Sequence, residues 1–569
     1  MKSVTTLIFD GDCGFCLRWV NWIRPKVGSQ VRVEPFQKVL PEFPQVSEGQ
    51  CRNSIQWMRS DGSVARGAEA FFEALATGPF SQWLTLYRAF VPFRLLSEWG
   101  YRWVATHRVM ANKVLEWLWG PSMPFSVRYE RLLSTLARGM GVVYAMAFVS
   151  LAVQSEGLWG PNGVLPARDY LGWLRETVGP SVVALWPTLF WIQTSLFFQK
   201  VVLGVGGIAA LFLILNRAPK WTALTAWIAY LSWVNVGQVF LEYQWDMLLL
   251  ESGLVLFVAL CLGPGRPALF LFRLLFFKFI FQSGLAKIES GDPTWRSLTA
   301  LQYHFETTPL PTTLSSFAHH APVWFLKITT ATTLFLECVT PFFFFCARNV
   351  RAGIFVLHLL LQIGIGVTGQ YGFFNILAIV LSLSLLEDSL PPFSQADWRI
   401  RSRRMSTKAI VITTIWPFLS FLPLPQLEGW HLSSHYGLFA SMTTSREELR
   451  IERKTLSGWE PYEFRWKPGK IDRAPRWVQP HMPRLDWQMW FASLGRCENQ
   501  RWLHQLLFRL LEGRPEVLAL FREPPPTLPA PTKLRVVRVP YHFSSPEGRL
   551  HGIWWNAGEA TPYCPEVSF

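Results

Sequence analysis

The chain has 569 residues, of which 50% are hydrophobic, 15% aromatic and only 16% charged. Soluble domains carry about 25% charged residues, so this composition excludes an ordinary soluble protein, and the length predicts two or three domains. The net charge of +15 is explained by basic loops facing an anionic leaflet. We predict no nucleic-acid partner, because no soluble segment combines a compact Lys/Arg patch with aromatic residues.

The first segment has the pattern of a cytosolic α/β domain. The opening "MKSVTTLIFDGD" has no long apolar core and no small-residue cleavage site, so it is not a secretory signal peptide. Short apolar strands are predicted at 4–9 and 31–36, and a helical face spans 17–23. A strand–turn–strand around Asp61-Gly62 is followed by a helix, "GAEAFFEALA". We predict a thioredoxin-like α/β domain over residues 1–115.

Two cysteines stand two residues apart in "FDGDCGFC", between the first strand and the first helix. A strand, a CxxC and a helix in this order are typical of a redox site. At the start of the helix, unpaired N–H groups and the helix dipole favour a Cys13 thiolate, and Cys16 one turn further on can resolve a mixed disulfide. Asp10 and Asp12 act in the opposite direction, because negative charge disfavours a thiolate. The alternative is half of a zinc site, which needs about two more ligands; Cys51 is the only other cysteine in this segment.

Several stretches of this segment resemble one known family. "DGDCGFC", "DGSVARGAEAFFEAL" and "YRWVATHRVMANK" are similar to the DCC-type thiol-disulfide oxidoreductases over residues 4–113. The resemblance implies a thioredoxin-like fold and dithiol/disulfide activity, with Asp12, Cys13 and Cys16 as the residues that name the family. We expect no metal and no cofactor besides the cysteine pair.

Residues 116–429 are predicted to form a polytopic helical membrane domain of eight or nine spans. Spanning helices need about 20 apolar residues. Apolar runs of about that length or somewhat shorter lie at 138–154, 198–215, 221–240, 246–262, 267–286, 323–345, 352–368, 372–386 and 408–423. Basic loops alternate with loops poor in Lys and Arg, so the positive-inside rule places the first domain in the cytosol and the tail on the opposite side if all nine runs cross.

Polar residues within these runs are costly and have either a structural or a functional role. They form a candidate intramembrane cluster: Asp246, Glu251, Lys278, Lys287 and His358. One interpretation is an interior network of ion pairs and hydrogen bonds. The other is a polar cavity that grips a substrate or moves protons.

Two segments outside the apolar runs are candidates for a client-binding face. The loop at 287–321 is too polar to cross a bilayer and too aromatic to be disordered, and residues 430–569 read as a soluble, β-rich α+β domain. Aromatic residues beside charges are common in recognition surfaces. The candidates are Trp295, Tyr303 and Phe305 in the loop, and Arg484, Asp486, Trp487 and Trp490 in the tail. For the tail residues the alternative is a helix of the structural core.

Residues 137–569 resemble the lipase maturation factor family. The matching stretches include "GLWGPNGVLPARDYL", "QWDMLLLESG", "SGDPTWRSLTALQYHFETTPLP" and "KPGKIDRAPRWVQPHMPRLDWQMWFASLG". The resemblance implies a membrane protein that helps secreted lipases reach an active fold. More distantly, "FIFQSGLAKIESGDPTW" is similar to the segment of vitamin K-dependent γ-carboxylases that carries a catalytic lysine, here Lys287. The fused first domain departs from animal maturation factors and suggests a bacterial inner-membrane protein.

Two functions from different classes follow. The first is a membrane-embedded maturation factor, whose partners are a secreted client such as a lipase, a thiol/disulfide redox partner and membrane lipids. The second is an integral-membrane enzyme that uses the polar cluster around Lys287 and Asp246 to modify a lipid, a quinone or a peptide. A co-purifying secreted protein favours the first, and a bound lipid or quinone favours the second.

Overall fold

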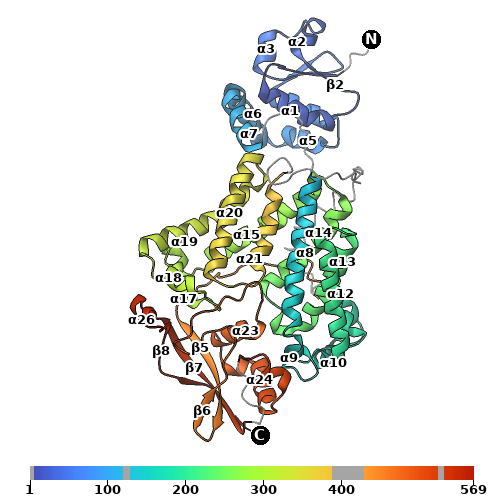
Figure 1. The fold of residues 1–569 in the computed structure, drawn as a ribbon. Helices are drawn as coiled ribbons and strands as arrows, with labels where there is room; N and C mark the ends of the chain where they lie inside the picture. Colours follow the sequence, from blue (N-terminus) through green and yellow to red (C-terminus); the bar gives the residue numbers. More distant parts are fainter. Residues whose placement is uncertain (1–4, 120–128, 388–428, 523–530, 569) are drawn as a thin grey trace. The chain divides into compact units, whose positions relative to one another are not determined.

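The computed structural model describes residues 5–119, 129–387, 429–522 and 531–568. The chain divides into two compact units, which we treat separately (Figure 1). Unit 1 is Met1–Ser126 with Phe345–Val350, and unit 2 is Val127–Phe344 with Arg351–Phe569. This division is coarser than the three predicted domains, so their boundaries at 115 and 429 stay predictions.

Unit 1 contains a four-stranded mixed sheet in the order β2-β1-β3-β4, with β1 parallel to β2 and antiparallel to β3. The strands and the helices around them confirm the α/β pattern. Their bounds are β1 Thr6–Phe9, α1 Gly14–Ile23, β2 Arg32–Pro35, α2 Phe36–Val39, α3 Glu48–Asn53, β3 Gln56–Met58, β4 Val64–Arg66, α4 Gly67–Ala76, α5 Ser81–Ala89, α6 Val91–Thr106 and α7 Arg108–Trp119.

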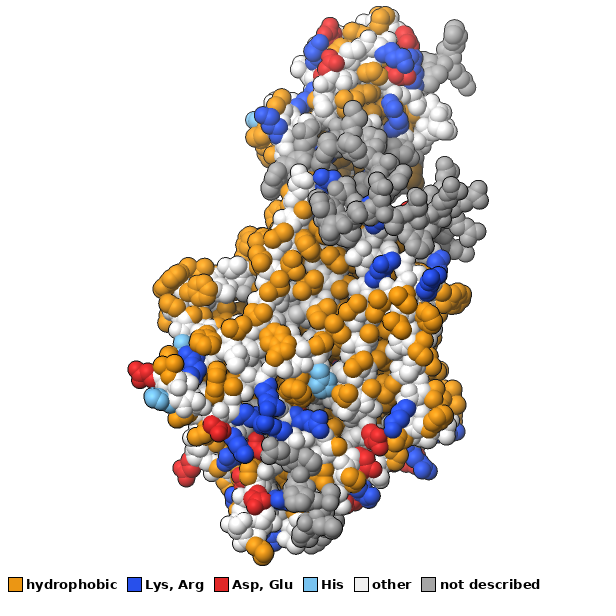
Figure 2. All heavy atoms as spheres, in the orientation of Figure 1, with side chains coloured by type: hydrophobic (Ala, Val, Ile, Leu, Met, Phe, Trp, Pro, Cys, Tyr) orange, Lys and Arg blue, Asp and Glu red, His pale blue; other side chains and the backbone are white. Residues whose placement is uncertain are grey.

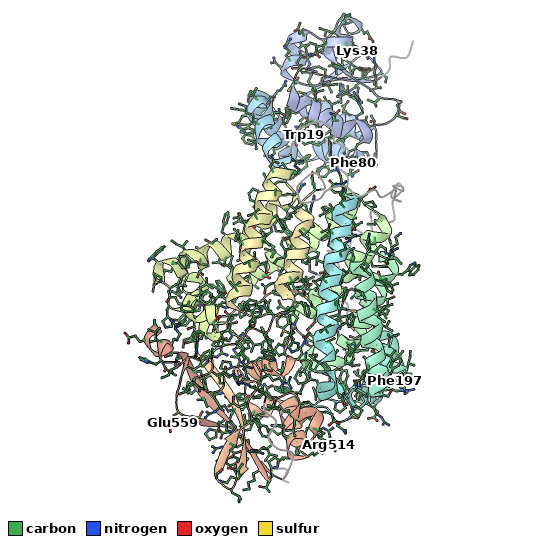
Figure 3. All side chains as sticks on the ribbon, viewed as in Figure 1. Trp19, Lys38, Phe80, Phe197, Arg514 and Glu559 are labelled. Carbon is green, nitrogen blue, oxygen red and sulfur yellow. A yellow bond between two sulfur atoms is a disulfide. The ribbon has the colours of Figure 1, made fainter. Side chains whose placement is uncertain are left out.

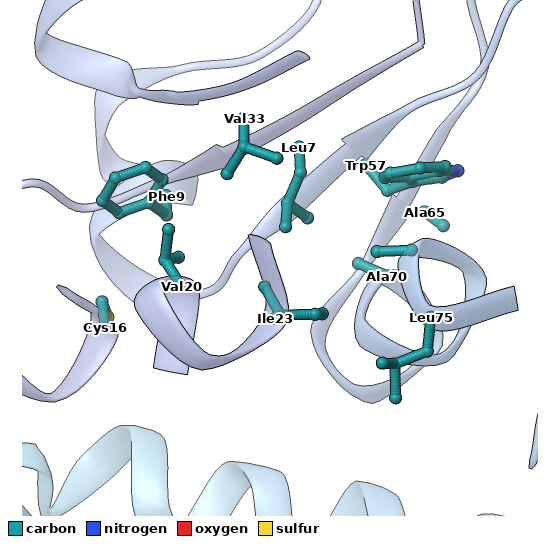
Figure 4. Packing of buried hydrophobic residues seen from close by; sticks show 11 residues of the cluster. Leu7, Phe9, Cys16, Val20, Ile23, Val33, Trp57, Ala65, Ala70 and Leu75 are labelled. Atoms are coloured by element: carbon teal, nitrogen blue, oxygen red, sulfur yellow. The ribbon is translucent and has the colours of Figure 1, made fainter. Parts of the chain in front are cut away.

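The sheet of unit 1 is covered on both faces, which explains why β1 is an unbroken apolar run. Leu7 and Phe9 point to the side where α1 packs with Cys16, Val20 and Ile23 (Figure 4). Ile8 points to the opposite face, where it joins a second cluster formed by α2 and α3. Alternation along a strand requires this division. Each fully buried aliphatic or aromatic side chain contributes about 1.5–3 kcal/mol, so the helix that carries the CxxC is anchored to the sheet.

Unit 2 begins with a helical region. Figure 2 shows hydrophobic side chains spread over these helices, while charged side chains gather over the strand-rich end of the same unit. The helices are α8 Glu130–Ala152, α9 Ser155–Trp159, α10 Ala167–Val178, α11 Val182–Leu185, α12 Leu196–Ile214, α13 Pro219–Gly237, α14 Gln244–Leu262, α15 Arg266–Glu289, α16 Pro293–Arg296, α17 Ala300–Thr307, α18 Thr313–His319, α19 Val323–Cys338, α20 Arg348–Thr368 and α21 Phe374–Ser382.

Five helices in the described ranges are long and apolar enough to cross a membrane: α8, α12, α14, α15 and α20. The predicted eight or nine spans are therefore not confirmed. The run at 221–240 forms α13, a helix of 19 residues that includes Trp227, Tyr230 and Asn235 and is not among the five. The runs at 323–345 and 372–386 form helices of only 16 and 9 residues, and the run at 408–423 lies outside the described residues.

Two glycines allow α8 and α12 to approach closely. A Cβ on Gly141 would lie 2.8 Å from the backbone nitrogen of Ile214, and a Cβ on Gly206 would lie 2.3 Å from the ring of Phe148. Small residues at such crossings are typical of helix pairs in membranes, where close van der Waals contact replaces the hydrophobic effect.

The C-terminal region of unit 2 confirms the expected mixture of strands and helices. Its sheet has the order β6-β5-β7-β8, and β9 also pairs with β7. The elements are β5 Arg446–Thr455, β6 Gly458–Pro461, α23 Arg484–Ser493, α24 Arg501–Leu511, α25 Pro515–Leu518, β7 Lys533–Phe543, α26 Pro546–Leu550, β8 Trp555–Ala557 and β9 Thr561–Ser568. A disulfide joins Cys497 to Cys564.

Candidate redox site and buried ion pairs

Cys13 is the N-cap of α1, as the sequence predicted. Its Sγ accepts a hydrogen bond from the backbone N–H of Cys16 at 3.4 Å. Hydrogen bonds from Cys16 to the thiolate are the main cause that lowers the pKa of Cys13 to about 6, and the positive charge of Arg108 acts in the same direction. A low-pKa thiol at a helix N-terminus is the attacking group of a thiol–disulfide exchange site.

Cys16 has the opposite character. Its side chain is buried in the core beneath α1. The hydrogen bond with Cys13 and the loss of solvent raise its pKa. Because only a thiolate attacks, this difference suits Cys13 to attack first and Cys16 to resolve the mixed disulfide, and these roles stay predictions.

The acidic residues beside the pair are fixed by Gln37, which the sequence analysis did not single out. Its Nε2 donates to Asp10 Oδ1 at 3.0 Å and to Asp12 Oδ2 at 3.1 Å, and its Oε1 accepts from the Gly11 N–H at 3.0 Å. A Cβ on Gly11 would come within 2.8 Å of Pro35, so the turn before Cys13 suits glycine. Asp10 raises the pKa of Cys13, as predicted, but this effect is smaller than that of the hydrogen bonds.

The pKa of Cys13 predicts a distinct pH profile. We expect the rate at which iodoacetamide alkylates Cys13 to rise with pH through a midpoint near pH 6. At pH 7 this rate should be close to its maximum, because about nine-tenths of the thiol is then ionised. Mass spectrometry of the Cys13 peptide measures this rate. Cys51 is the internal control, since burial raises its pKa. A Cys13 midpoint above pH 8 would contradict the assignment.

Among the residues that the structure describes, no further metal ligands are grouped with Cys13 and Cys16. Within the described ranges, one group of three residues has metal-ligand spacing, namely Cys497, His504 and Cys564. Its two cysteines are joined in the disulfide. Neither Cys13 nor Cys16 belongs to such a group.

The predicted intramembrane cluster is not one site, because its members have different partners. Asp246, at the start of α14, forms a double ion pair with Arg484 of α23, with N–O distances of 2.5 and 2.7 Å. The hydroxyl of Tyr230 also donates to Asp246 Oδ1 at 2.5 Å. Both charged side chains are buried. For Asp246 this agrees with the first of the two interpretations, an interior network of ion pairs, and Arg484, which was a candidate for client binding, is its partner.

Glu251 and Lys278 form a second buried pair, at 2.8 Å between Nζ and Oε1. The start of the C-terminal segment completes it: Ser433 contacts both charges, and the Tyr436 hydroxyl donates to Glu251 Oε2 at 2.6 Å. A chain segment that lies far away in the sequence therefore satisfies the polar groups of α14 and α15.

Lys287 and His358 contact different partners from each other and from the two pairs above. Lys287 pairs with Glu337 of α19 at 2.7 Å, and His358 shares a hydrogen bond with Thr340 at 2.8 Å. All four side chains are buried. These contacts support the structural interpretation of the polar residues, a set of ion pairs and hydrogen bonds.

Six of the seven side chains predicted for a client-binding face are buried: Trp295, Phe305, Arg484, Asp486, Trp487 and Trp490. Their binding of a client stays a prediction. Tyr303 is 36% exposed. The buried residues join the loop to the tail. The indoles of Trp295 and Trp490 donate to the carbonyls of Phe439 and Thr307, and Asp486 accepts from the backbone N–H groups of Trp466 and Lys467. The aromatic composition of these segments fits a packed junction as well as an exposed surface.

The same junction contains a charged group that the sequence analysis missed. Arg446 of β5 is buried and pairs with Glu448, which also pairs with Lys467. Arg446 donates in addition to the backbone carbonyls of Glu306, Thr308 and Pro309. Arg446 is 138 positions from Thr308, and no local sequence signal connects the strand to the 287–321 loop.

Helices that can span a membrane, an α/β unit with a poised cysteine pair and a strand-rich C-terminal region together define an integral membrane protein with a thiol–disulfide module. Comparison with known families agrees. Residues 131–392 match the lipase maturation factor transmembrane domain, residues 432–565 the lipase maturation factor C-terminal domain, and residues 7–114 the DCC1-like thiol-disulfide oxidoreductases. The chain belongs to the lipase maturation factor family.

Individual relatives support this assignment. Lipase maturation factor 2 of Mus musculus is 32% identical over 588 residues, covering 76% of this chain and 82% of the relative. Lipase maturation factor 1 of Bos taurus is 30% identical over 496 residues, covering 76% and 88%. These relatives are vertebrate proteins and give no support to the bacterial origin that we predicted. No solved structure matches the chain.

Proposed function

We propose that this maturation factor couples client handling in unit 2 to thiol–disulfide exchange at Cys13 and Cys16 of unit 1. The observation that carries the redox part is the Cys13 thiol, which caps α1 and has its pKa lowered to about 6. The client class, a secreted lipase, follows from the family. The cysteine pair itself is the redox group, and no further cofactor is invoked.

The exchange would proceed through a mixed disulfide. The Cys13 thiolate attacks one sulfur of a partner disulfide, forming a new S–S bond, and the partner's other sulfur leaves as a thiolate that takes up a proton. Cys16 then loses its proton and attacks Cys13 Sγ, which releases the first partner sulfur. The partner disulfide is reduced by two electrons, and the Cys13–Cys16 dithiol is oxidised by two. The same steps run backwards to oxidise a partner.

We further propose that the two ends of the chain face compartments of different redox state. Cys13 and Cys16 are free thiols, whereas Cys497 and Cys564 are joined. Disulfides persist in oxidising compartments and thiols in reducing ones. An odd number of membrane crossings, such as the five candidate spans, would likewise place the N-terminal and C-terminal regions on opposite sides of the membrane. Unit 1 would then lie on the cytosolic side, and the C-terminal region on the side where secreted clients fold.

Trapping tests the roles of the two cysteines. A Cys16→Ser variant lacks the resolving thiol, so we expect mixed disulfides to accumulate. The rate at which they are resolved should fall by at least about tenfold. Cys13→Ser should trap nothing. Non-reducing gels with mass spectrometry of the adducts measure both, and Cys51→Ser is the matched control. Equal trapping by the Cys13 and Cys16 variants would contradict the redox assignment. Because the proposal places Cys13 on the cytosolic side, the adducts should be cytosolic thiol partners, and a secreted client among them would contradict the proposed arrangement across the membrane.

A further inference from the structure

Helix α6 turns an apolar stripe outward. Leu95, Leu96, Trp99 and Trp103 are 62%, 65%, 65% and 46% exposed. Their spacing places them on one side of the helix. No residue of α6 is fully buried. A surface helix of a soluble domain normally packs such a stripe against its core. In α6 the apolar stripe is exposed instead.

The stripe continues onto the neighbouring helices. Further exposed apolar residues lie on α5, at the α5–α6 junction and on α7: Trp83, Leu86, Phe90, Val91, Val109, Met110 and Val114. We call the stripe and these residues the α5–α7 face. Large exposed apolar patches mark interaction sites, and tryptophan is the residue type that favours a membrane–water interface.

The charges around the α5–α7 face are mainly basic. Arg94, Arg102 and Lys113 are exposed on the same helices. The acidic residue of α6, Glu98, is partly buried and accepts a hydrogen bond from the Tyr87 hydroxyl at 2.6 Å. An apolar, tryptophan-rich face with a basic rim fits a bilayer surface that carries anionic lipids.

We propose that the α5–α7 face binds the surface of the phospholipid bilayer that the same chain crosses, with its apolar side chains at the level of the lipid headgroups. Chain connectivity favours lipid over a soluble partner. Helix α7 ends at Trp119 and the first candidate span, α8, begins at Glu130. The connection can extend to about 40 Å at most, so the bilayer is always within reach of the face.

The proposal links lipid binding to the redox pair. Asn112 of α7 lies beside Gly14, 3.0 Å from where a Cβ on that glycine would be. The helix that contributes to the α5–α7 face therefore also borders the CxxC turn. A domain held in this way presents its cysteines to partners at the membrane surface.

Photo-crosslinking of the full chain tests the proposal. Benzoylphenylalanine is placed at Leu96 or Trp99, and the protein is irradiated in nanodiscs of mixed zwitterionic and anionic phospholipid. The control position is Lys38 of α2 (Figure 3), whose side chain is 66% exposed and lies outside the α5–α7 face. Mass spectrometry should find on the order of tenfold more lipid adduct at positions 96 and 99 than at position 38.

Other results would overturn the proposal. Adducts from position 96 or 99 to peptides of unit 2 would show that the face packs within the chain, and a crosslinked dimer would show that it binds a second copy. Unreacted probe at both positions would show that water covers the face. A midpoint of Cys13 alkylation equal to that of the unmodified chain confirms that unit 1 is folded in each variant, so a misfolded probe variant is recognised.

Discussion

Replacing Arg484 with alanine is expected to destabilise unit 2 by about 3–5 kcal/mol, because the change leaves the Asp246 carboxylate buried without its partner. Arg484 also donates to the carbonyl of Phe240 at 3.2 Å, so a backbone acceptor loses its donor as well. Limited proteolysis of the membrane-embedded protein measures the effect, since the C-terminal region should be cleaved faster. Abundance in the membrane should fall in parallel.

Two control variants distinguish the loss of this buried ion pair from the loss of an arginine charge elsewhere. Arg514 pairs with Glu512 on the exposed surface, where solvent screens the charges, so Arg514→Ala should leave protease resistance unchanged. In the double variant Asp246→Asn, Arg484→Met, no ionised group is left unpaired, so it should recover part of the loss. If Arg484→Ala and Arg514→Ala have the same protease resistance, the helical and C-terminal regions of unit 2 do not depend on this ion pair for their association.

The buried pairs explain how the C-terminal region is joined to the helices. Arg484 reaches α14, Tyr436 reaches Glu251, and Arg446 binds carbonyls of the 287–321 loop. Each contact satisfies a polar group that would otherwise be costly in an apolar surrounding. The helical region and the strand-rich region therefore stabilise one another, and a client would have to use surfaces other than this junction.

Local features of the fold could be predicted from the sequence. The start of α1 at Cys13, the turn at Asp61-Gly62 and the helix at 67–76 follow from residues within a few positions of one another. The same is true of the low pKa of Cys13, which depends on the first turn of its own helix. Local propensity and periodicity determine such elements.

Long-range pairing could not be predicted in this way. Asp246 and Arg484 are 238 positions apart, and nothing in either segment indicates the other. The aromatic residues around Trp487 have a composition that suits an exposed recognition site and a packed junction equally well, and the structure packs them against Trp245 and Tyr371. Hydropathy alone likewise could not separate helices that span from apolar helices that are only buried.

Replacing Cys497 with serine is expected to destabilise the C-terminal region by about 4 kcal/mol, because the disulfide closes a long loop between cysteines whose sequence separation is 67. Local structure gives little compensation. Cys564 lies on β9, whose register with β7 shifts on both sides of the Val536–Cys564 pair. Bulges weaken the ladder, and Pro562, which pairs with Val537, has no N–H to donate. Cys497→Ser should therefore release β9, which protease cleavage after Arg538 or Lys533 can detect.

The redox state of the same cysteines tests the proposed arrangement across the membrane. When cells are quenched in acid and then denatured, so that every thiol becomes accessible, a thiol reagent of high mass should add to Cys497 and Cys564 only after reduction, whereas Cys13 should react without it. Cys261→Ser removes an exposed free thiol and should change neither protease resistance nor the state of the disulfide. If Cys497 and Cys564 react as readily as Cys13 before reduction, both ends of the chain lie in a reducing compartment. The exchange site and the client would then have to meet on one side, because thiolate chemistry requires direct contact between sulfurs.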